Sequence, residues 1–195
     1  MRTGCTKSVH THFPNDLTHV SPVVKINSQT LILTTGKDGL LRAVDADSHE
    51  IIYSKPFTTR LNAGDPITTV ASRTCPGPLG GNEWNGAAYS AKLRVVFVPA
   101  TDGCATAKKD TSAPDADKEH MHGFYFGGEG QFDKWEDAHG WLTAFDAASG
   151  ETKWRYAASK PIIGGVTTTA GNIVLAGELT GDFIVLDATG GVIQP

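Results

Sequence analysis

The chain has 195 residues, enough for one large domain or two small ones, since a typical domain has about 150. Its 17 basic and 21 acidic residues give a formal net charge of -4, and no run of basic residues is present. This balance excludes a general nucleic-acid or anionic-membrane surface, and a hydrophobic content of 39% excludes disorder throughout the chain.

No apolar stretch approaches the about 18 residues that a membrane-spanning helix needs. The N-terminal residues also lack the apolar core of a secretory signal peptide, so no export signal is predicted in this chain. The 22 glycines and 10 prolines supply many turns, and long helix-forming runs are scarce. This composition favours β structure.

Three similar segments along the chain each predict a strand that ends in a tight turn. In each segment a glycine precedes an aspartate by six residues, and mostly apolar residues fill the interval. The segments are residues 39–45, 140–146 and 181–187. An aspartate side chain can bond to the backbone beyond it, and a following glycine such as Gly150 permits a positive φ. Each segment is therefore predicted to open a β-hairpin.

Aromatic residues predict how neighbouring repeats meet. Tyr53 stands eight positions after Asp45, and Trp154 stands eight positions after Asp146. A single hairpin cannot bury both of its faces, so the units must stack against one another. The aromatic side chain is expected to dock against the neighbouring unit.

The spacing of the aspartates predicts propeller blades. The step from Asp146 to Asp187 is close to the about 40 to 45 residues of a four-stranded blade. The step from Asp45 to Asp146 is more than two such periods. This longer interval contains an expected strand at residues 93–99 and a segment near residues 105–130 that lacks apolar periodicity. That segment is predicted to be an exposed insertion loop.

The cysteines and histidines do not predict a metal site. With only Cys5, Cys75 and Cys104 in the chain, at least one cysteine is unpaired within a monomer, and no C-x-x-C motif suggests zinc. His120 and His122 lie in a polar segment, where such a pair is more typical of an ordinary loop. No phosphate-binding glycine loop or nucleophilic-serine motif is present.

Four stretches resemble the pyrroloquinoline quinone (PQQ) dependent dehydrogenases, the quinoprotein alcohol and glucose dehydrogenases. The stretches are residues 16–22, 35–40 (T-G-K-D-G-L), 80–90 (G-G-N-E-W-N-G-A-A-Y-S) and 140–154. Members of that family are eight-bladed β-propellers that bind PQQ on the propeller axis beside calcium or a lanthanide. The resemblance implies an all-β chain of four-stranded antiparallel blades, incomplete relative to eight. Residues 1–195 would be a single partial propeller domain of roughly four blades, matching the C-terminal part of the family.

The resemblance also implies residues that contact the cofactor. Lys37 matches the lysine or arginine that contacts the quinone carbonyl, where a cation stabilises negative charge as hydride arrives. Glu83 and Trp84 stand where many members have Asn-Trp against PQQ, and an indole can pack on the flat ring. Outside that context Trp84 would be expected in a core. Glu83 departs from the asparagine of the pattern.

The position of the catalytic base departs from the family pattern as well. Members carry H-D-x-W-D-x-D, whose middle aspartate accepts the alcohol proton, whereas this chain has residues 10–16 there (H-T-H-F-P-N-D). Pro14 falls at the base position and cannot accept a proton. Asp16 matches the last aspartate and is the remaining catalytic candidate. The metal ligands and vicinal cysteines of the family come from its N-terminal blades and are not expected in this chain.

Two further expectations come from the resemblance. Related proteins close a similar loop with a disulfide, so Cys75 and Cys104 are predicted to pair if the chain reaches an oxidising compartment. The family also implies a periplasmic location.

The favoured hypothesis is a fragment resembling a PQQ-dependent dehydrogenase that oxidises an alcohol or sugar by hydride transfer to PQQ. Activity of the chain by itself is not predicted. One alternative is a non-catalytic PQQ-repeat propeller that acts as a binding scaffold, and another is a remnant of a truncated gene. Open propeller edges also predict self-association.

Overall fold

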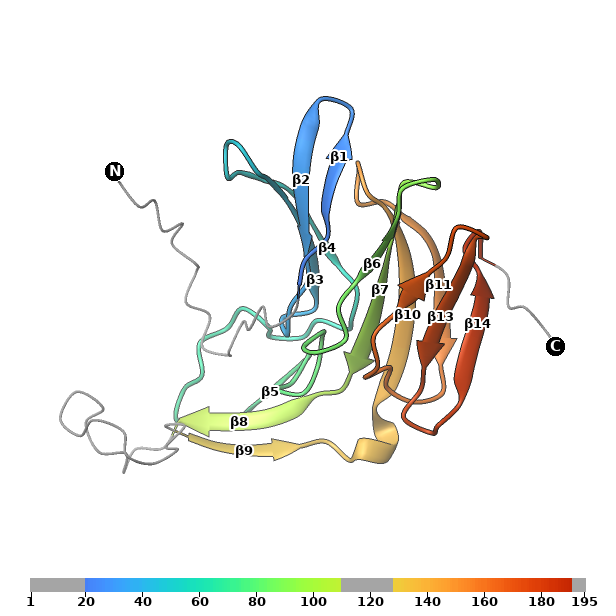
Figure 1. Ribbon diagram of the computed structural model, residues 1–195. Coiled ribbons are helices and arrows are strands. Elements are labelled where there is room, and N and C mark those ends of the chain that lie inside the picture. The colour runs from blue at the N-terminus through green and yellow to red at the C-terminus, as the bar shows by residue number, and fades with distance from the viewer. Residues whose placement is uncertain (1–19, 110–127, 191–195) are drawn as a thin grey trace, which may run out of the picture.

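The computed structural model describes residues 20–109 and 128–190, and this part of the chain is all-β. Its only helical element there is the short 3-10 helix η1 (Trp135–Asp137). Three sheets stand side by side like successive blades, and a fourth sheet lies at their foot (Figure 1). No helix in the described part is long and apolar enough to cross a membrane.

The first two blades are four-stranded and the third has three described strands, all paired antiparallel. Blade 1 contains β1 (Val23–Ile26), β2 (Gln29–Thr34), β3 (Leu40–Asp45) and β4 (Ile51–Pro56) in that order. Blade 2 contains β6 (Ala88–Ser90), β7 (Val95–Asp102), β10 (His139–Asp146) and β11 (Thr152–Ala158). Blade 3 contains β12 (Thr167–Thr168), β13 (Ile173–Gly177) and β14 (Phe183–Asp187).

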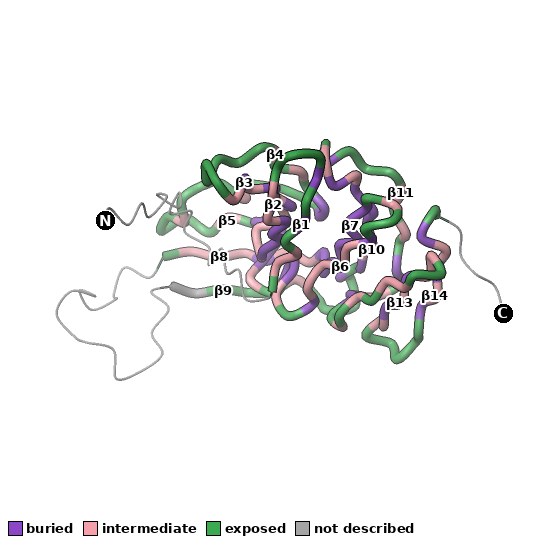
Figure 2. The backbone as a smooth tube through the Cα atoms, turned by 45° about the horizontal axis from the view of Figure 1, so that its top comes forward, coloured by how far each residue is buried: buried purple, intermediate pink, exposed green. Residues whose placement is uncertain are grey.

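The blades stack face to face, and successive side chains of each strand point to opposite faces of its sheet. Strand β7 is buried along its whole length, since its two faces enter two different cores. Val96 and Val98 pack toward blade 1, where they meet Leu33 and Leu41. Val95 and Phe97 pack toward blade 3. Buried positions therefore gather between the blades, as Figure 2 shows.

The repeat predicted from the sequence is confirmed as the third strand of each blade and the turn after it. The three segments form β3, β10 and β14, and each strand ends at its aspartate. The position four residues after the aspartate has a positive φ in the first two blades, at His49 (62°) and Gly150 (68°). The predicted hairpins follow in blades 1 and 2, where β4 and β11 pair with the strand before the turn.

Docking of the aromatic residues is also confirmed. The Tyr53 hydroxyl of blade 1 donates to the carbonyl oxygen of Ala147 in the turn of blade 2 at 3.0 Å. The Trp154 indole of blade 2 donates to the carbonyl oxygen of Ala188 in the turn of blade 3 at 3.0 Å. A Cβ at Gly150 would lie 2.6 Å from the Tyr53 ring, so the aromatic leaves room only for glycine. The turns of blades 2 and 3 thus each accept a hydrogen bond from the aromatic residue of the preceding blade.

The repeat aspartates hold their turns through acceptor oxygens. Asp45 Oδ1 accepts from the backbone N–H groups of Asp47 and Ser48, and Asp146 Oδ1 does the same from Ala148 and Ser149. Hydrogen bonds from Ser48 lower the pKa of Asp45, and those from Thr189 lower the pKa of Asp187. Desolvation raises the pKa of Asp146, but the N–H groups of Ser149 and Ala148 together with the side chains of Lys153 and Ser149 outweigh it, so that this pKa is lowered too.

We expect the fold to lose stability as the pH falls below the ordinary aspartate pKa of 3.8. A carboxyl whose pKa is lowered in the folded state stabilises it above the unfolded pKa, and this contribution disappears as the pH falls through the folded value. Urea denaturation at neutral pH and in steps below about pH 4 measures the effect. The variant Asp146→Asn keeps an acceptor oxygen without the titration, so it should lose less stability than the wild type over this range. Equal losses would contradict the assignment to Asp146.

The fourth sheet corrects one expectation. The segment near residues 105–130 is not a loop throughout, because β8 (Ala105–Lys109) and β9 (Gly128–Phe132) pair in it. Together with β5 (Ser72–Thr74) they form the side sheet at the foot of the blades. Residues 110–127 lie outside the described part. The estimate of about four blades for the whole domain stays a prediction.

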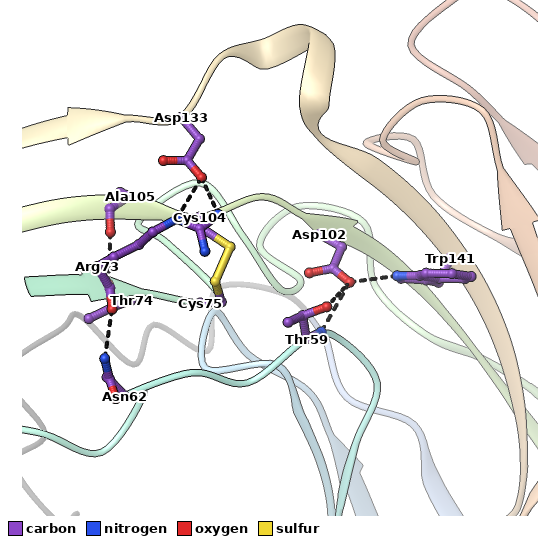
Figure 3. Close-up of a disulfide and its surroundings, with 10 residues drawn as sticks. All are labelled: Thr59, Asn62, Arg73, Thr74, Cys75, Asp102, Cys104, Ala105, Asp133 and Trp141. Carbon is purple, nitrogen blue, oxygen red and sulfur yellow. Dashed lines mark hydrogen bonds and ion pairs between the residues drawn. A yellow bond between two sulfur atoms is a disulfide. The ribbon is translucent and has the colours of Figure 1, made fainter.

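The predicted disulfide between Cys75 and Cys104 is formed, with a sequence separation of 29. Cys75 follows directly after β5, and Cys104 directly precedes β8. The bond therefore joins neighbouring strands of the side sheet at the end next to blade 2 (Figure 3). In the chain-entropy model a cross-link of this span stabilises the fold by about 3 to 4 kcal/mol.

Candidate functional site

Lys37 lies in the tight turn between β2 and β3 of blade 1. The N–H of Gly39 donates to the carbonyl oxygen of Gly36 at 3.0 Å and closes the turn. Gly39 has a φ of 71°, and a Cβ there would collide with Thr58 Oγ1 at 1.9 Å. Glycine at this position therefore allows the turn to lie against the chain that leaves blade 1.

The loop before β6 crosses directly over this turn. Gly81 has a φ of 73°, and a Cβ there would lie 2.5 Å from the carbonyl oxygen of Gly36 and 2.6 Å from that of Lys37. The N–H of Asn82 donates to the Gly36 oxygen at 3.2 Å. Two segments that are far apart in the sequence thus come into backbone contact.

This crossing brings Lys37 and Glu83 together. Lys37 Nζ lies 2.6 Å from Glu83 Oε1, and their side chains are only 13% and 16% exposed. An ion pair with so little solvent around it is less screened than a surface pair, so it holds both groups in place. The structure therefore places two of the three residues that the sequence assigned to cofactor binding in direct contact.

Trp84, the third of these residues, is 68% exposed. This exposure excludes the alternative that Trp84 is a core residue. Its indole ring presents an open aromatic surface next in sequence to the ion pair. The arrangement combines a mostly buried cation, its carboxylate partner and an exposed ring.

Two asparagines that the sequence analysis did not single out hold this loop. Asn82 is fully buried, and its amide N–H₂ donates to the carbonyl oxygens of Asn85 and Pro99. Asn85 is 3% exposed, accepts from the Glu83 N–H at 3.0 Å, and donates to the carbonyl oxygen of Ile162 at 2.6 Å. Both belong to the G-G-N-E-W-N-G stretch. Their positions directly before Glu83 and directly after Trp84 could have marked them as candidates in the sequence.

The remaining candidates fall elsewhere. Asp16 and Pro14 lie outside the described residues, as do His120 and His122. Across residues 20–109 and 128–190, no group of three histidine, cysteine or acidic side chains is arranged to hold a metal ion.

Chemically, the Lys37 site can place positive charge beside an electron-accepting group and flank it with a ring. Glu83 lowers the net charge that such a group meets, because its carboxylate neutralises the ammonium.

The chain is similar in sequence to several known proteins. No family model matches the chain. It is 31% identical over 183 residues to lupanine 17-hydroxylase [cytochrome c] of a Pseudomonas species, an alignment that covers 84% of this chain and 25% of that protein. It is 28% identical over 192 residues to the dehydrogenase subunit of the quinone alcohol dehydrogenase of Acetobacter aceti, covering 86% of this chain and 26% of that subunit.

Solved structures give the same fold. The quinohemoprotein alcohol dehydrogenase ADHIIG of Pseudomonas putida HK5 superposes with a TM-score of 0.72 at 18% identity, covering 90% of this chain and 30% of that one. The all-β propeller prediction is thereby confirmed. The chain spans about a quarter of the length of the curated relatives that it matches, 25% and 26%. The chain is thus a relative of the quinoprotein alcohol dehydrogenases and corresponds to part of their propeller.

Proposed function

We propose that the chain supplies one wall of a PQQ site in a quinoprotein dehydrogenase that oxidises an alcohol or a sugar. The observation that carries the proposal is the convergence of Lys37 and Glu83 beside the exposed indole of Trp84. These residues come from the two stretches that most resemble the cofactor-binding segments of the family. The similarity to quinone alcohol dehydrogenases supports the same reaction class.

The residues present fit the quinone in chemistry, and the Trp84 side chain is open to solvent. PQQ, when bound, supplies the hydride acceptor of the reaction. Lys37 is a cation on the one turn where the family contacts the quinone oxygens, and Gly81 brings a second backbone against that turn. Trp84 keeps most of its ring surface available for a planar partner. In this proposal Lys37 stabilises negative charge, Glu83 orients Lys37, and Trp84 covers one face of the site.

Calcium or a lanthanide and a catalytic base are further parts of the proposal, and the metal ligands would come from other segments of the propeller. Asp16 is the candidate base within this chain. We propose a periplasmic location as well. The disulfide between Cys75 and Cys104 supports it, because such bonds persist in oxidising compartments.

Titration of the purified chain with PQQ, with and without calcium or lanthanum, tests the proposal through quenching of tryptophan fluorescence. We expect saturable binding that Lys37→Ala weakens at least tenfold, because the charge facing the quinone oxygens is lost. Lys25→Ala removes an exposed lysine of β1 and should leave the affinity unchanged. Glu83→Gln removes a negative charge from the site and should tighten binding. A folded chain that binds no PQQ would refute the proposal.

The ion pair itself favours a second candidate function. Glu83 stands where many relatives carry asparagine, and it engages the lysine that would otherwise meet the quinone alone. The chain would then be a non-catalytic propeller scaffold. This candidate predicts that neither the wild type nor Glu83→Gln binds PQQ, which separates it from the first.

We also propose that copies of the chain associate through the outer blades. Val23, Ile32, Val44 and Ile51 form a row across blade 1 on the face away from blade 2. Val23 is 65% exposed and Ile51 59%, and Phe183 on blade 3 is 68% exposed. A second copy packed on this face would bury these side chains, as blade 2 buries the opposite face of blade 1. Light scattering should report a mass above that of a monomer, and Val23→Lys should shift it toward the monomer. A monomeric wild type at all concentrations would contradict this.

A further inference from the structure

A cavity of about 510 Å³ lies between the side sheet and the lower end of blade 2. Its wall includes the disulfide, the end of β7, the start of β10 and the chain that leaves blade 1. Lys37, Glu83 and Trp84 do not line it, so it is separate from the candidate cofactor wall. Its volume falls within the about 300 to 1,000 Å³ typical of small-molecule sites.

Asp102 is the fixed polar group of this cavity. It is only 8% exposed, and its Oδ2 accepts from the Thr59 N–H at 3.0 Å, the Thr59 hydroxyl at 2.9 Å and the Trp141 indole at 2.7 Å. None of the residues in the described ranges donates a hydrogen bond to Oδ1. Figure 3 shows this second oxygen pointing away from Trp141, toward the side of the disulfide. A buried carboxylate with one oxygen immobilised and one left over is an acceptor in a fixed position.

Trp141 is held rigidly on the same wall. The Arg155 guanidinium lies 4.6 Å from the centre of its ring, on blade 2. Arg155 is held in turn by hydrogen bonds to the Thr143 hydroxyl at 3.0 Å and the Phe57 carbonyl oxygen at 2.6 Å. Asp102 therefore sits in a chain of contacts that fixes its orientation before any ligand arrives.

The rest of the lining combines open aromatic rings with balanced charge. Phe132 is 53% exposed and Trp135 40% exposed, and both line the cavity. Among the described residues, and apart from the titratable His139, the charged side chains of the lining are three cations and three anions: Arg60, Arg73, Lys134, Asp102, Asp133 and Asp137. With no net charge, the site favours neither an anion nor a cation. No cluster suited to a metal ion occurs among the described residues, which argues against an inorganic cation.

We propose that this cavity binds a neutral polyhydroxylated molecule, a sugar or polyol. Its hydroxyl groups would donate to Asp102 Oδ1 and accept from the cationic side chains, and its C–H faces would pack on Phe132 and Trp135. This assignment uses each feature of the lining: a fixed acceptor, several donors, exposed rings and no net charge. The proposal does not depend on PQQ binding.

Isothermal titration of the full chain with sorbitol and with methyl glucoside tests it, and choline and inorganic phosphate serve as charged probes. We expect saturable binding of at least one neutral probe. Phe132→Ala should weaken it at least fivefold, and Asp102→Asn at least tenfold, because an amide N–H₂ would then replace the available acceptor. Val70→Ala, which truncates an exposed apolar side chain outside the cavity lining, should leave the affinity unchanged.

Three outcomes would overturn the proposal. The first is a folded wild type that binds neither neutral probe at millimolar concentration. The second is tighter binding of choline or phosphate than of either neutral probe. The third is binding that Phe132→Ala and Val70→Ala affect equally. Circular dichroism of each variant separates loss of binding from loss of fold, and Phe132→Ala keeps the test decisive if Asp102→Asn does not fold.

Discussion

Replacing Trp154 by alanine is expected to lower the free energy of unfolding by about 3 to 5 kcal/mol, the range for large aromatic residues cut back to alanine. The indole lies between two blades, with its ring 5.7 Å from that of Phe97. Its N–H donates to the Ala188 carbonyl oxygen, and its ring occupies the space that a side chain at Gly190 would need. The variant thus removes apolar contact and leaves a carbonyl oxygen without its donor.

Urea denaturation followed by circular dichroism measures this loss. Trp84→Ala is a matched control, because Trp84 is 68% exposed and should contribute less than about 0.5 kcal/mol. Similar losses in the two variants would mean that docking of Trp154 on the next turn contributes little to the stack of blades. A Trp154→Phe variant should recover part of the loss, since it restores a ring but not the indole N–H.

The repeat was predictable from the sequence because its physical requirements are local. Asp146 needs only the backbone two and three residues ahead, and Gly150 needs only a positive φ. Docking of Tyr53 and Trp154 was predictable because each aromatic stands at a constant distance from a recognisable turn. One short sequence pattern therefore predicts both the strand and the contact that its aromatic residue makes with the next blade.

The side sheet was not predictable in the same way. Strand β8 has the burial pattern of a partly exposed strand, and its partner β9 follows only after a long insertion. Without alternation of apolar and polar residues, residues 105–109 resembled a loop. The pairing depends on contacts between distant segments, including the disulfide, that no short pattern records.

The residues of the candidate site could be predicted from the sequence, but the ion pair between two of them could not. Family resemblance pointed to Lys37, Glu83 and Trp84, yet the 2.6 Å ion pair depends on Gly81 crossing the turn at Gly36. The cavity around Asp102 was missed because its lining comes from several elements. A carboxylate at the end of a strand carries no sign of function until the surrounding fold is known.

Substitution of Asn82 should lower the free energy of unfolding more than substitution of any other residue of the Lys37 site. Its amide N–H₂ donates to the carbonyl oxygens of Asn85 and Pro99, and its Oδ1 accepts from the Thr35 hydroxyl at 3.0 Å. In Asn82→Asp a buried carboxylate would face two carbonyl oxygens without a proton to share. We expect the free energy of unfolding at neutral pH to fall by about 3 kcal/mol or more.

The pH dependence identifies the cause of that loss. Burial and the facing carbonyl oxygens raise the pKa of the introduced carboxyl in the folded state, so the destabilisation is present above that pKa and shrinks as the pH falls through it. Urea denaturation should therefore show the gap between Asn82→Asp and the wild type narrowing in acid. Asn62→Asp is the control, because Asn62 also donates to a backbone carbonyl, that of Arg73, at an exposed position. A gap that stayed constant with pH, or a loss as large in Asn62→Asp, would show that burial of Asn82 is not what holds the loop carrying Glu83 against the turn of Lys37.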